Sequence, residues 1–223
     1  MSDADDERIV AAYNARLDTH GYDPRTLGWD KGRHHLRFEV LCSHWDLAGL
    51  RVLDFGCGFG DLFGYLREQG VDAEYHGIDI NPRLVDEGRS RFPDAHLEVR
   101  DVLKQGLEQP YDVILSSGVH NISREDAQGF TRRTFQIFAQ HAEVGFACNF
   151  LSSRVDRRLD HAHHSDPVDV LGLCYEHSRR VVLRNDYMPF EFTVFVDMRQ
   201  GFDGRHVVYP EYVHLVREVD DDG

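Results

Sequence analysis

Short apolar runs alternate with amphipathic stretches through the middle of this chain. We expect strands over residues 51–55, 74–79, 95–100, 111–115 and 143–150, and helices over residues 61–69, 82–91 and 123–141. The runs have the length of ordinary strands, and the stretches between them place apolar residues at helical spacing. Such alternation predicts an α/β fold with a mostly parallel sheet covered by helices on both faces.

Residues 1–50 precede this alternation and carry two helical patterns, over 7–17 and 33–47. The first pattern stops at Gly21 and at Pro24, which cannot continue a helix. We therefore expect residues 1–50 to form a helical extension of the same domain.

The other end of the chain changes to a different pattern. Residues 180–184 and 190–196 are two β-forming runs separated by turn residues, which predicts an antiparallel hairpin. Residues 51–200 are then the expected core, and residues 201–223 a C-terminal tail.

Composition narrows the classes of function. The chain has 223 residues, is 41% hydrophobic and carries a net charge of −14. An acidic surface repels phosphate backbones, so we expect a small-molecule partner and no nucleic acid. No apolar run is long enough for a membrane span, and the acidic start is unlike a signal peptide. Four scattered cysteines indicate reduced thiols, so we expect a cytoplasmic protein, as a monomer or homodimer.

The most informative segment is residues 53–61, Leu-Asp-Phe-Gly-Cys-Gly-Phe-Gly-Asp. A strand runs into three glycines and then into a helix, so the backbone can approach a ligand closely at a helix N-terminus. Dinucleotide-binding turns need a further glycine three residues after the second. That position is Asp61 or Phe63, depending on the register, so the dinucleotide fingerprint fails in both.

The remaining pattern, Asp-x-Gly-x-Gly-x-Gly, resembles the first motif of the class I S-adenosylmethionine-dependent methyltransferases. The resemblance extends from about residue 50 to residue 196. It implies a Rossmann-like, seven-stranded sheet that ends in the antiparallel hairpin, with S-adenosylmethionine as cofactor. Residues 149–156 and 184–192 resemble a group of small bacterial methyltransferases, many without an assigned substrate.

The resemblance also implies which residues hold the cofactor. Ligands of open parallel sheets bind outside the carboxyl ends of the strands. Asp54 would hold the glycine loop and the amino-acid end, Asp79 the ribose hydroxyls, and Asp101 the adenine amino group. The full set of expected cofactor residues is Asp54, Gly56, Cys57, Gly58, Gly60, Asp79, Ile80, Asp101, Val102, Ser116 and Ser117.

The segment after the fourth strand, residues 116–121, faces the methyl group in this architecture. It departs from the Asn/Asp-Pro-Pro-Tyr of enzymes that methylate nucleobase amines. An oxygen acceptor of high pKa needs a base, most often histidine. His120 is thus a candidate general base with Asn121 as orienting group, and the alternative is that His120 only caps the following helix.

Residues 160–166 form a second cluster of polar groups. His163 and Asp166 are candidate metal ligands, and His161 and His164 are candidate proton carriers. The alternative is a solvated loop with Asp166 as the cap of a helix that begins at Pro167. We favour the alternative and expect no metal site.

Several further residues are candidates for acceptor binding. Arg154, Arg184 and Tyr187 could recognise an anionic acceptor, or the arginines could form ordinary surface ion pairs. In the extension, Tyr13, Trp29, Lys31 and Arg33 either contact the acceptor or pack the extension onto the core.

The sequence therefore predicts an S-adenosylmethionine-dependent methyltransferase of a small molecule, acting at oxygen by in-line displacement. Two alternatives stay open. One is an NAD-dependent oxidoreductase, and the other is a non-catalytic protein that binds S-adenosylmethionine or S-adenosylhomocysteine.

Overall fold

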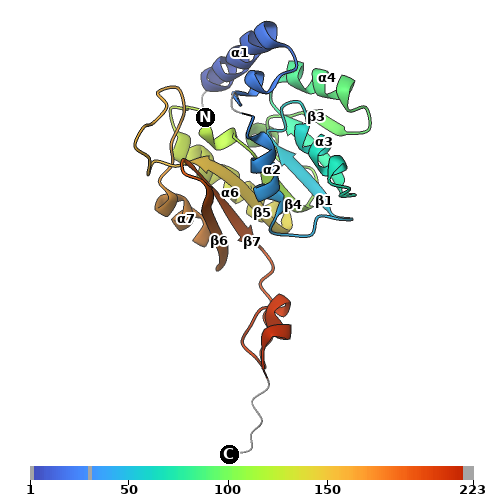
Figure 1. The fold of residues 1–223 in the computed structure, drawn as a ribbon, viewed down its shortest axis with the longest axis vertical. Helices are drawn as coiled ribbons and strands as arrows, with labels where there is room; N and C mark the ends of the chain where they lie inside the picture. The colour runs from blue at the N-terminus through green and yellow to red at the C-terminus, as the bar shows by residue number, and fades with distance from the viewer. Residues whose placement is uncertain (1–2, 30–31, 218–223) are drawn as a thin grey trace, which may run out of the picture.

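The structure is a computed structural model that describes residues 3–29 and 32–217 (Figure 1). Lys31, one of the extension residues named above, lies outside the described residues. None of the helices in the described part of the chain is long and apolar enough to cross a membrane.

A seven-stranded sheet with the order β3-β2-β1-β4-β5-β7-β6 forms the centre. The first five strands in the chain are parallel, and β7 runs antiparallel to both β5 and β6. This confirms the predicted fold class. The strands are β1 (Arg51–Phe55), β2 (Glu74–Asp79), β3 (His96–Val99), β4 (Tyr111–Ser116), β5 (Ala142–Leu151), β6 (Arg180–Met188) and β7 (Glu191–Asp197).

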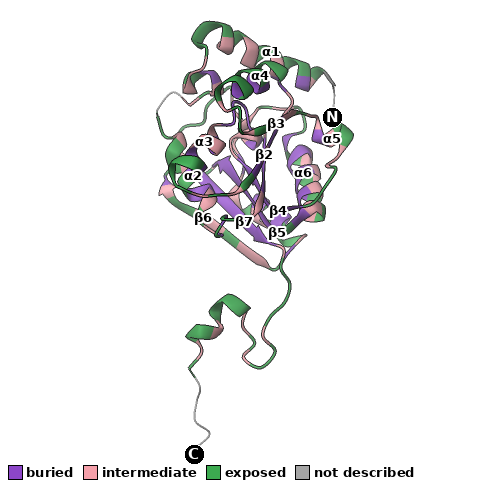
Figure 2. Ribbon diagram, turned by 90° about the vertical axis from the view of Figure 1, so that its right-hand side faces the viewer, coloured by how far each residue is buried: buried purple, intermediate pink, exposed green. Residues whose placement is uncertain are grey.

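Helices cover both faces of the sheet. One face carries α2 (His34–Cys42), α3 (Asp61–Glu68) and α4 (Pro82–Arg91), and the other carries α5 (Val102–Gln105), α6 (Ala127–His141) and α7 (Pro167–Tyr175). Successive strand residues point to opposite faces, so Val52 of β1 packs in one core and Leu53 in the other. The burial colours in Figure 2 show the strands buried between the helices.

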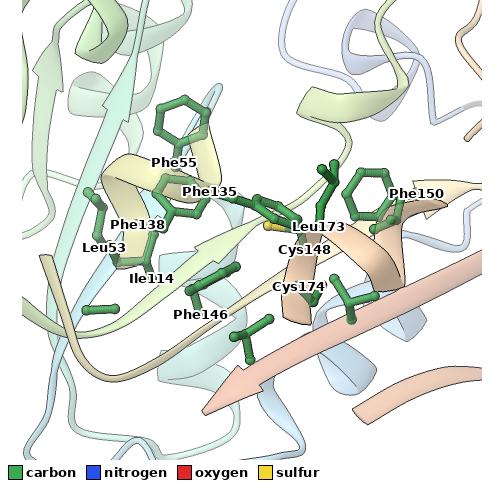
Figure 3. Close-up of a cluster of buried hydrophobic side chains, with 14 of the residues drawn as sticks. Leu53, Phe55, Ile114, Phe135, Phe138, Phe146, Cys148, Phe150, Leu173 and Cys174 are labelled. Carbon is green, nitrogen blue, oxygen red and sulfur yellow. The ribbon is translucent and has the colours of Figure 1, made fainter. Parts of the chain in front are cut away.

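The core under α6 and α7 is rich in phenylalanine (Figure 3). Phe135, Phe138, Phe146 and Phe150 are completely buried there. Their rings pack at 5.1–6.3 Å between centroids in tilted or edge-on pairs. Side chains of this size bury enough apolar area to dominate the packing of a sheet face against its helices.

The N-terminal helix α1 (Asp3–His20) lies beside the carboxyl ends of the strands. Asn14 accepts a hydrogen bond from Asn81 at 3.1 Å, and Asp18 pairs with Arg83 at 2.7 Å. At the other end of the helix, Arg8 donates to the Ser123 carbonyl at 2.6 Å. A short 3₁₀ helix, η1 (Pro24–Leu27), follows and leads to α2.

Some boundaries differ from those predicted. The second helix of the extension ends at Cys42 and not at residue 47, because the chain turns there to bury Trp45 and Leu47 against the sheet. Strand β6 continues to Met188 through an irregular stretch after Arg184, so the hairpin turns at residues 189–190. Short helices α5 and η2 (Val119–Asn121) were not predicted.

The C-terminal segment extends away from the body of the molecule in Figure 1. It contains a 3₁₀ helix, η3 (Pro210–Leu215). Within it, Glu211 pairs with Arg180 and Arg199 at 3.1 and 2.9 Å, which ties the segment to the end of the hairpin.

Candidate functional site

A cavity of about 740 Å³ lies over the carboxyl ends of the parallel strands. The strand order reverses between β1 and β4, and an open α/β sheet binds its ligand at such a point. Residues after β1, β2, β3 and β4 form one wall, and α1, η1 and the start of α2 form the opposite wall. The volume lies in the range of about 300–1,000 Å³ that is usual for small-molecule sites.

The glycine loop after β1 has the geometry that its sequence requires. Gly56, Gly58 and Gly60 all have left-handed φ angles, of 77°, 56° and 78°. A Cβ atom on Gly56 would lie 2.1 Å from the Val119 side chain, so only glycine fits there. Gly56, Cys57 and Gly58 line the cavity, whereas Gly60 lies at the N-cap of α3 and outside the lining.

Asp54 is buried at the end of β1 and reaches the cavity wall. Its carboxylate accepts a hydrogen bond of 2.7 Å from the Tyr75 hydroxyl. Burial raises the pKa of Asp54 to about 7, although the Tyr75 hydrogen bond opposes the shift. A cationic group of a ligand beside this carboxyl would favour its ionised form.

Asp79 at the end of β2 fixes the backbone around the cavity. One carboxylate oxygen accepts the Gly58 N–H at 2.9 Å, and the other accepts the Asn81 N–H at 2.8 Å. Burial raises the pKa of Asp79, and these backbone hydrogen bonds oppose the shift. Ile80 follows in the cavity wall, so this strand end offers a carboxylate beside an apolar surface.

The ends of β3 and β4 contribute further polar groups. Asp101 lines the cavity, caps α5 by accepting the Leu103 N–H at 3.2 Å, and pairs with Lys104 at 2.9 Å. Val102 lies beside it in the lining. After β4, Ser117 lines the cavity and its buried Oγ has no hydrogen-bond partner among the described residues. Ser116 is buried under the wall and is not part of the lining that the structure describes.

His120 is not placed as a general base. Its side chain is 2% exposed, is absent from the described cavity lining, and lies among the rings of Phe130, Phe135 and Phe150. Nδ1 pairs with the Thr131 hydroxyl at 3.2 Å. Burial lowers the pKa of His120 to about 3, which keeps the ring neutral at pH 7. The η2 turn directs the His120 side chain into the core, so this position gives no support to the predicted general base, which stays a hypothesis.

Asn121 lines the cavity, but its side chain holds the backbone together. The Asn121 Oδ1 accepts the Leu151 N–H at 2.6 Å, and its carbonyl accepts the His163 N–H at 2.9 Å. These bonds join the turn after β4 to the end of β5 and to the loop that follows. The arrangement supports a positioning role and not the orientation of His120.

The His-rich loop, residues 160–166, divides into structural and cavity-facing groups. His164 lines the cavity, but its ring nitrogens bond the Ser152 carbonyl at 2.9 Å and the Leu159 N–H at 3.0 Å. Asp166 caps α7 by accepting the Val168 N–H at 2.9 Å, as the alternative reading of the loop predicts. His161 is exposed and lines the cavity.

The described residues contain one group of three side chains that could hold a metal ion, and it lies elsewhere. His76, His96 and Glu98 meet on β2 and β3. His76 and His96 pair across the two strands near their amino ends, opposite the edge that carries the cavity.

The candidates for acceptor binding also divide into residues that line the cavity and residues that lie outside it. Arg154 is exposed and pairs with Asp166 at 2.9 Å, and Arg184 pairs with Asp186 at 3.1 Å. The Tyr187 hydroxyl bonds Thr193 at 2.9 Å over the sheet. None of these three belongs to the described cavity lining, so the cavity gives no support to their predicted role in acceptor binding. Tyr13, Trp29 and Arg33 of the extension do line the cavity.

Sequence reasoning missed a buried ion pair that joins the extension to the sheet. Glu191, at the start of β7, is completely buried and accepts hydrogen bonds of 2.8 and 2.9 Å from Arg37 of α2. Glu191 also accepts the Asn149 amide at 2.9 Å, and the Asn149 Oδ1 accepts the Gly118 N–H at 2.7 Å. The alternating pattern of β7 gave no signal that a carboxylate would be buried at its first residue.

Comparisons with known proteins agree with this geometry. Residues 52–141 match the family described as "Methyltransferase domain". A Mycobacterium tuberculosis protein, provisionally named a methyltransferase, is 28% identical over 152 residues, which are 65% of this chain and 91% of that protein. The malonyl-[acyl-carrier protein] O-methyltransferase of Acetivibrio thermocellus is 36% identical over 70 residues, covering 30% of this chain and 25% of that enzyme.

Solved structures show the same fold. The TehB-like S-adenosylmethionine-dependent methyltransferase of Corynebacterium glutamicum aligns with a TM-score of 0.56 and 22% identity, over 86% of this chain and 99% of that one. The magnesium protoporphyrin IX methyltransferase of Synechocystis, solved with bound S-adenosylhomocysteine, aligns with a TM-score of 0.57 and 15% identity, over 74% of this chain and 83% of that one.

The sheet order, the terminal hairpin and the cavity above the glycine loop define an S-adenosylmethionine-dependent methyltransferase fold. The family match over residues 52–141 and the sheet order together support a class I S-adenosylmethionine-dependent methyltransferase. S-adenosylmethionine is the cofactor of that class, which argues against the dinucleotide alternative.

Proposed function

We propose that this protein transfers the methyl group of S-adenosylmethionine to an oxygen atom of a small molecule. The observation that carries the proposal is a cavity with room for both a cofactor and a small acceptor. It extends from Asp79 and the glycine loop to Leu151 and Phe190 at the ends of β5 and the hairpin. Cofactor and acceptor can therefore occupy one enclosed space.

The residues present suit the cofactor. Asp54 offers a carboxylate to an ammonium group, and Asp79 and Asp101 offer acceptors to ribose hydroxyls and an amino group. Ser117 belongs to the same wall, and its buried hydroxyl has no partner among the described residues. Cys57, Ile80 and Val102 supply apolar surface beside them. The left-handed glycines let the backbone approach the ligand without a side chain between.

Bound S-adenosylmethionine supplies an electrophilic methyl group on a sulfonium. The chain's own residues would hold the acceptor in line with it and exclude water. Tyr13 and Trp29 from the extension close the wall opposite the sheet, so α1 and η1 shield the reacting groups. A small acceptor suits this enclosed geometry, and the O-methyltransferase name of the Acetivibrio relative favours oxygen.

The first test is calorimetric titration of the purified protein with S-adenosylhomocysteine, S-adenosylmethionine and NAD. We expect micromolar binding of the first two and none of NAD. Acceptor-dependent release of S-adenosylhomocysteine then separates an enzyme from a non-catalytic binding protein. Binding without turnover on any acceptor in a broad panel would favour the binding protein.

A further inference from the structure

We propose that the acceptor carries a carboxylate or phosphate group, and that Arg33 and Arg157 bind this group. The proposal rests on the proposed function and deepens it by naming the acceptor class. It replaces Arg154 and Tyr187, which lie outside the cavity, with two arginines that line it.

The cavity is more cationic than the chain around it. The whole sequence has 39 acidic and 25 basic residues, yet arginine outnumbers aspartate among the described lining residues. The lining cations are Arg8, Arg16, Arg33, Arg37, Arg100, Arg124 and Arg157, and the acidic residues are Asp6, Asp54, Asp79 and Asp101. A cavity with low-dielectric walls and an excess of one charge concentrates ligands of the opposite charge.

Carboxylates of the protein already pair with some of these arginines. Arg37 pairs with Glu191 at 2.7 Å, Arg124 with Asp6 at 2.9 Å, and Arg8 with Asp5 at 3.0 Å. Arg100 pairs with Glu98 at 2.6 Å.

Arg16, Arg33 and Arg157 differ from this group. They form no ion pair with any residue in the ranges 3–29 and 32–217. Arg33 and Arg157 are exposed in the cavity wall and Arg16 is half-buried, so a ligand that enters the cavity can supply the anion that the described residues do not.

Arg33 and Arg157 lie on the side of the cavity away from Asp79. The Arg33 guanidinium is 5.6 Å from the centroid of the Phe190 ring, at the hairpin turn. The Phe190 carbonyl accepts the Ser152 N–H at 2.9 Å, so this turn adjoins the start of the loop that carries Arg157. Arg33 therefore lies beside the start of β7, and Arg157 follows the end of β5, which pairs with the start of β7.

The loop that carries Arg157 is held in place at several points. His164 bonds the Ser152 carbonyl at 2.9 Å, and the His163 N–H bonds the Asn121 carbonyl at 2.9 Å. Ala162 pairs with Ile122 in an isolated β-bridge. A fixed loop lowers the entropy cost of placing an arginine against a ligand.

Arg16 belongs to the other half of the cavity. It follows Tyr13 on α1, and its guanidinium lies 5.3 Å from the centroid of that ring. Asn14, next to Tyr13 on α1, accepts a hydrogen bond of 3.1 Å from Asn81, which follows the end of β2, so this part of α1 lies on the cofactor side. Arg16 is thus the arginine available to the carboxylate of the cofactor, which leaves Arg33 and Arg157 for a second anion.

The lining around these arginines is apolar, so the acceptor is expected to have an apolar part as well as an anionic group. Trp29, Leu151, Leu159 and Phe190 line this side of the cavity. Guanidinium groups form paired hydrogen bonds with the planar oxygens of a carboxylate or phosphate, and they also stack on aromatic rings. The expected acceptor is an organic acid or phosphate ester with an apolar or aromatic body.

The test uses the protein saturated with S-adenosylhomocysteine and three probes of similar shape. Phenylacetate, phenyl phosphate and the neutral phenylacetamide are titrated by NMR at concentrations up to millimolar. We expect at least one anion to bind about tenfold more tightly than the amide. The preferred anion distinguishes a carboxylate from a phosphate acceptor. Arg33→Gln and Arg157→Gln should each weaken binding of that anion by about three- to tenfold and leave the amide unaffected.

Arg158→Gln is the matched control. Arg158 neighbours Arg157 and is exposed, but it donates to the Ser153 carbonyl at 3.1 Å and is outside the described lining. This variant should bind all probes like the parent. Affinity for S-adenosylhomocysteine should stay unchanged in all three variants, because Arg16 and not these residues serves the cofactor.

Three results would overturn the inference while leaving the proposed function intact. They are equal binding of the anions and the amide, no binding of either anion, and unchanged anion binding in both cavity variants. A loss of S-adenosylhomocysteine affinity in Arg33→Gln or Arg157→Gln would also overturn it, because the arginine would then serve the cofactor. Failure of the parent protein to bind S-adenosylhomocysteine would instead refute the proposed function.

Discussion

Replacing Asp79 with asparagine tests the cofactor half of the site. The carboxylate accepts the backbone N–H groups of Gly58 at 2.9 Å and Asn81 at 2.8 Å, and Asp79 also lines the cavity. Asparagine keeps the shape of the side chain but has only one acceptor oxygen. Its NH₂ group must point at one of the two N–H donors or toward the ligand.

The expected loss follows from these contacts. A hydrogen bond to a charged group contributes about 1.5–3 kcal/mol, whereas a neutral one contributes about 0.5–1.5 kcal/mol. Asp79→Asn should therefore weaken S-adenosylhomocysteine binding by about 1–3 kcal/mol, or roughly 5- to 150-fold. Part of this loss is movement of the glycine loop, because the Gly58 N–H depends on the same carboxylate.

Calorimetry with two nucleosides distinguishes the loss of affinity caused by movement of the glycine loop from the loss caused by a missing hydrogen bond to the ribose. The parent protein should bind 5′-methylthioadenosine more tightly than its 2′-deoxy analogue, because Asp79 accepts a hydroxyl hydrogen bond. Asp79→Asn should reduce this difference. The control is Asp86→Asn, which alters a surface ion pair with Arg89 on α4. If the parent binds the two nucleosides equally, or if Asp79→Asn leaves S-adenosylhomocysteine affinity unchanged, the ribose assignment is refuted.

Two further predictions concern buried titratable groups. Burial raises the pKa of Asp54 to about 7, and a cationic ligand end selects its ionised form, so S-adenosylhomocysteine affinity should fall as pH decreases below about 7. Calorimetry between about pH 5.5 and 7.5 measures this, and Asp54→Asn should remove the dependence; a flat profile in the parent would contradict the assignment. His120 has a folded pKa of about 3 against 6.5 for an exposed histidine, so its neutral burial loses stability as pH falls from 6.5 toward 3. His120→Phe should flatten the decline in unfolding temperature over that range and keep turnover, whereas a loss of about 10²–10⁴-fold in turnover would restore the general-base hypothesis.

The presence of most expected cofactor residues in the cavity wall was predictable, because it depends on local sequence. Strand β1, the glycine loop and α3 are contiguous, and Asp79 and Asp101 end the next two strands in the chain. Parallel strands bring their carboxyl ends to one edge, so the spacing of these residues along the chain determines which of them meet. Ser116 and Gly60 were expected in the same set but lie outside the described lining, because Ser116 is the last residue of the buried strand β4 and Gly60 is the N-cap of α3.

The acceptor side was not predictable in this way. His120 and Asn121 are adjacent in the sequence, but the η2 turn directs His120 into a cluster of phenylalanines and leaves Asn121 in the wall. Arg154 and Arg157 occupy one loop, yet only Arg157 lines the cavity, since Arg154 pairs with the helix cap Asp166. The direction of a side chain in an irregular segment depends on contacts that spacing does not encode.

The sequence by itself determined the class of fold, the position of the glycine loop and the acidic strand ends, because alternation and turn chemistry act over a few residues. Only the tertiary structure decided which cations face the cavity, because that choice depends on which arginines find carboxylates elsewhere in the molecule. Arg37 donates a hydrogen bond to the buried Glu191, which is 154 residues away in the sequence. Arg33 and Arg157 form no ion pair with the residues that the structure describes, and they line the cavity. The anionic character of the acceptor is inferred from this contrast with Arg37.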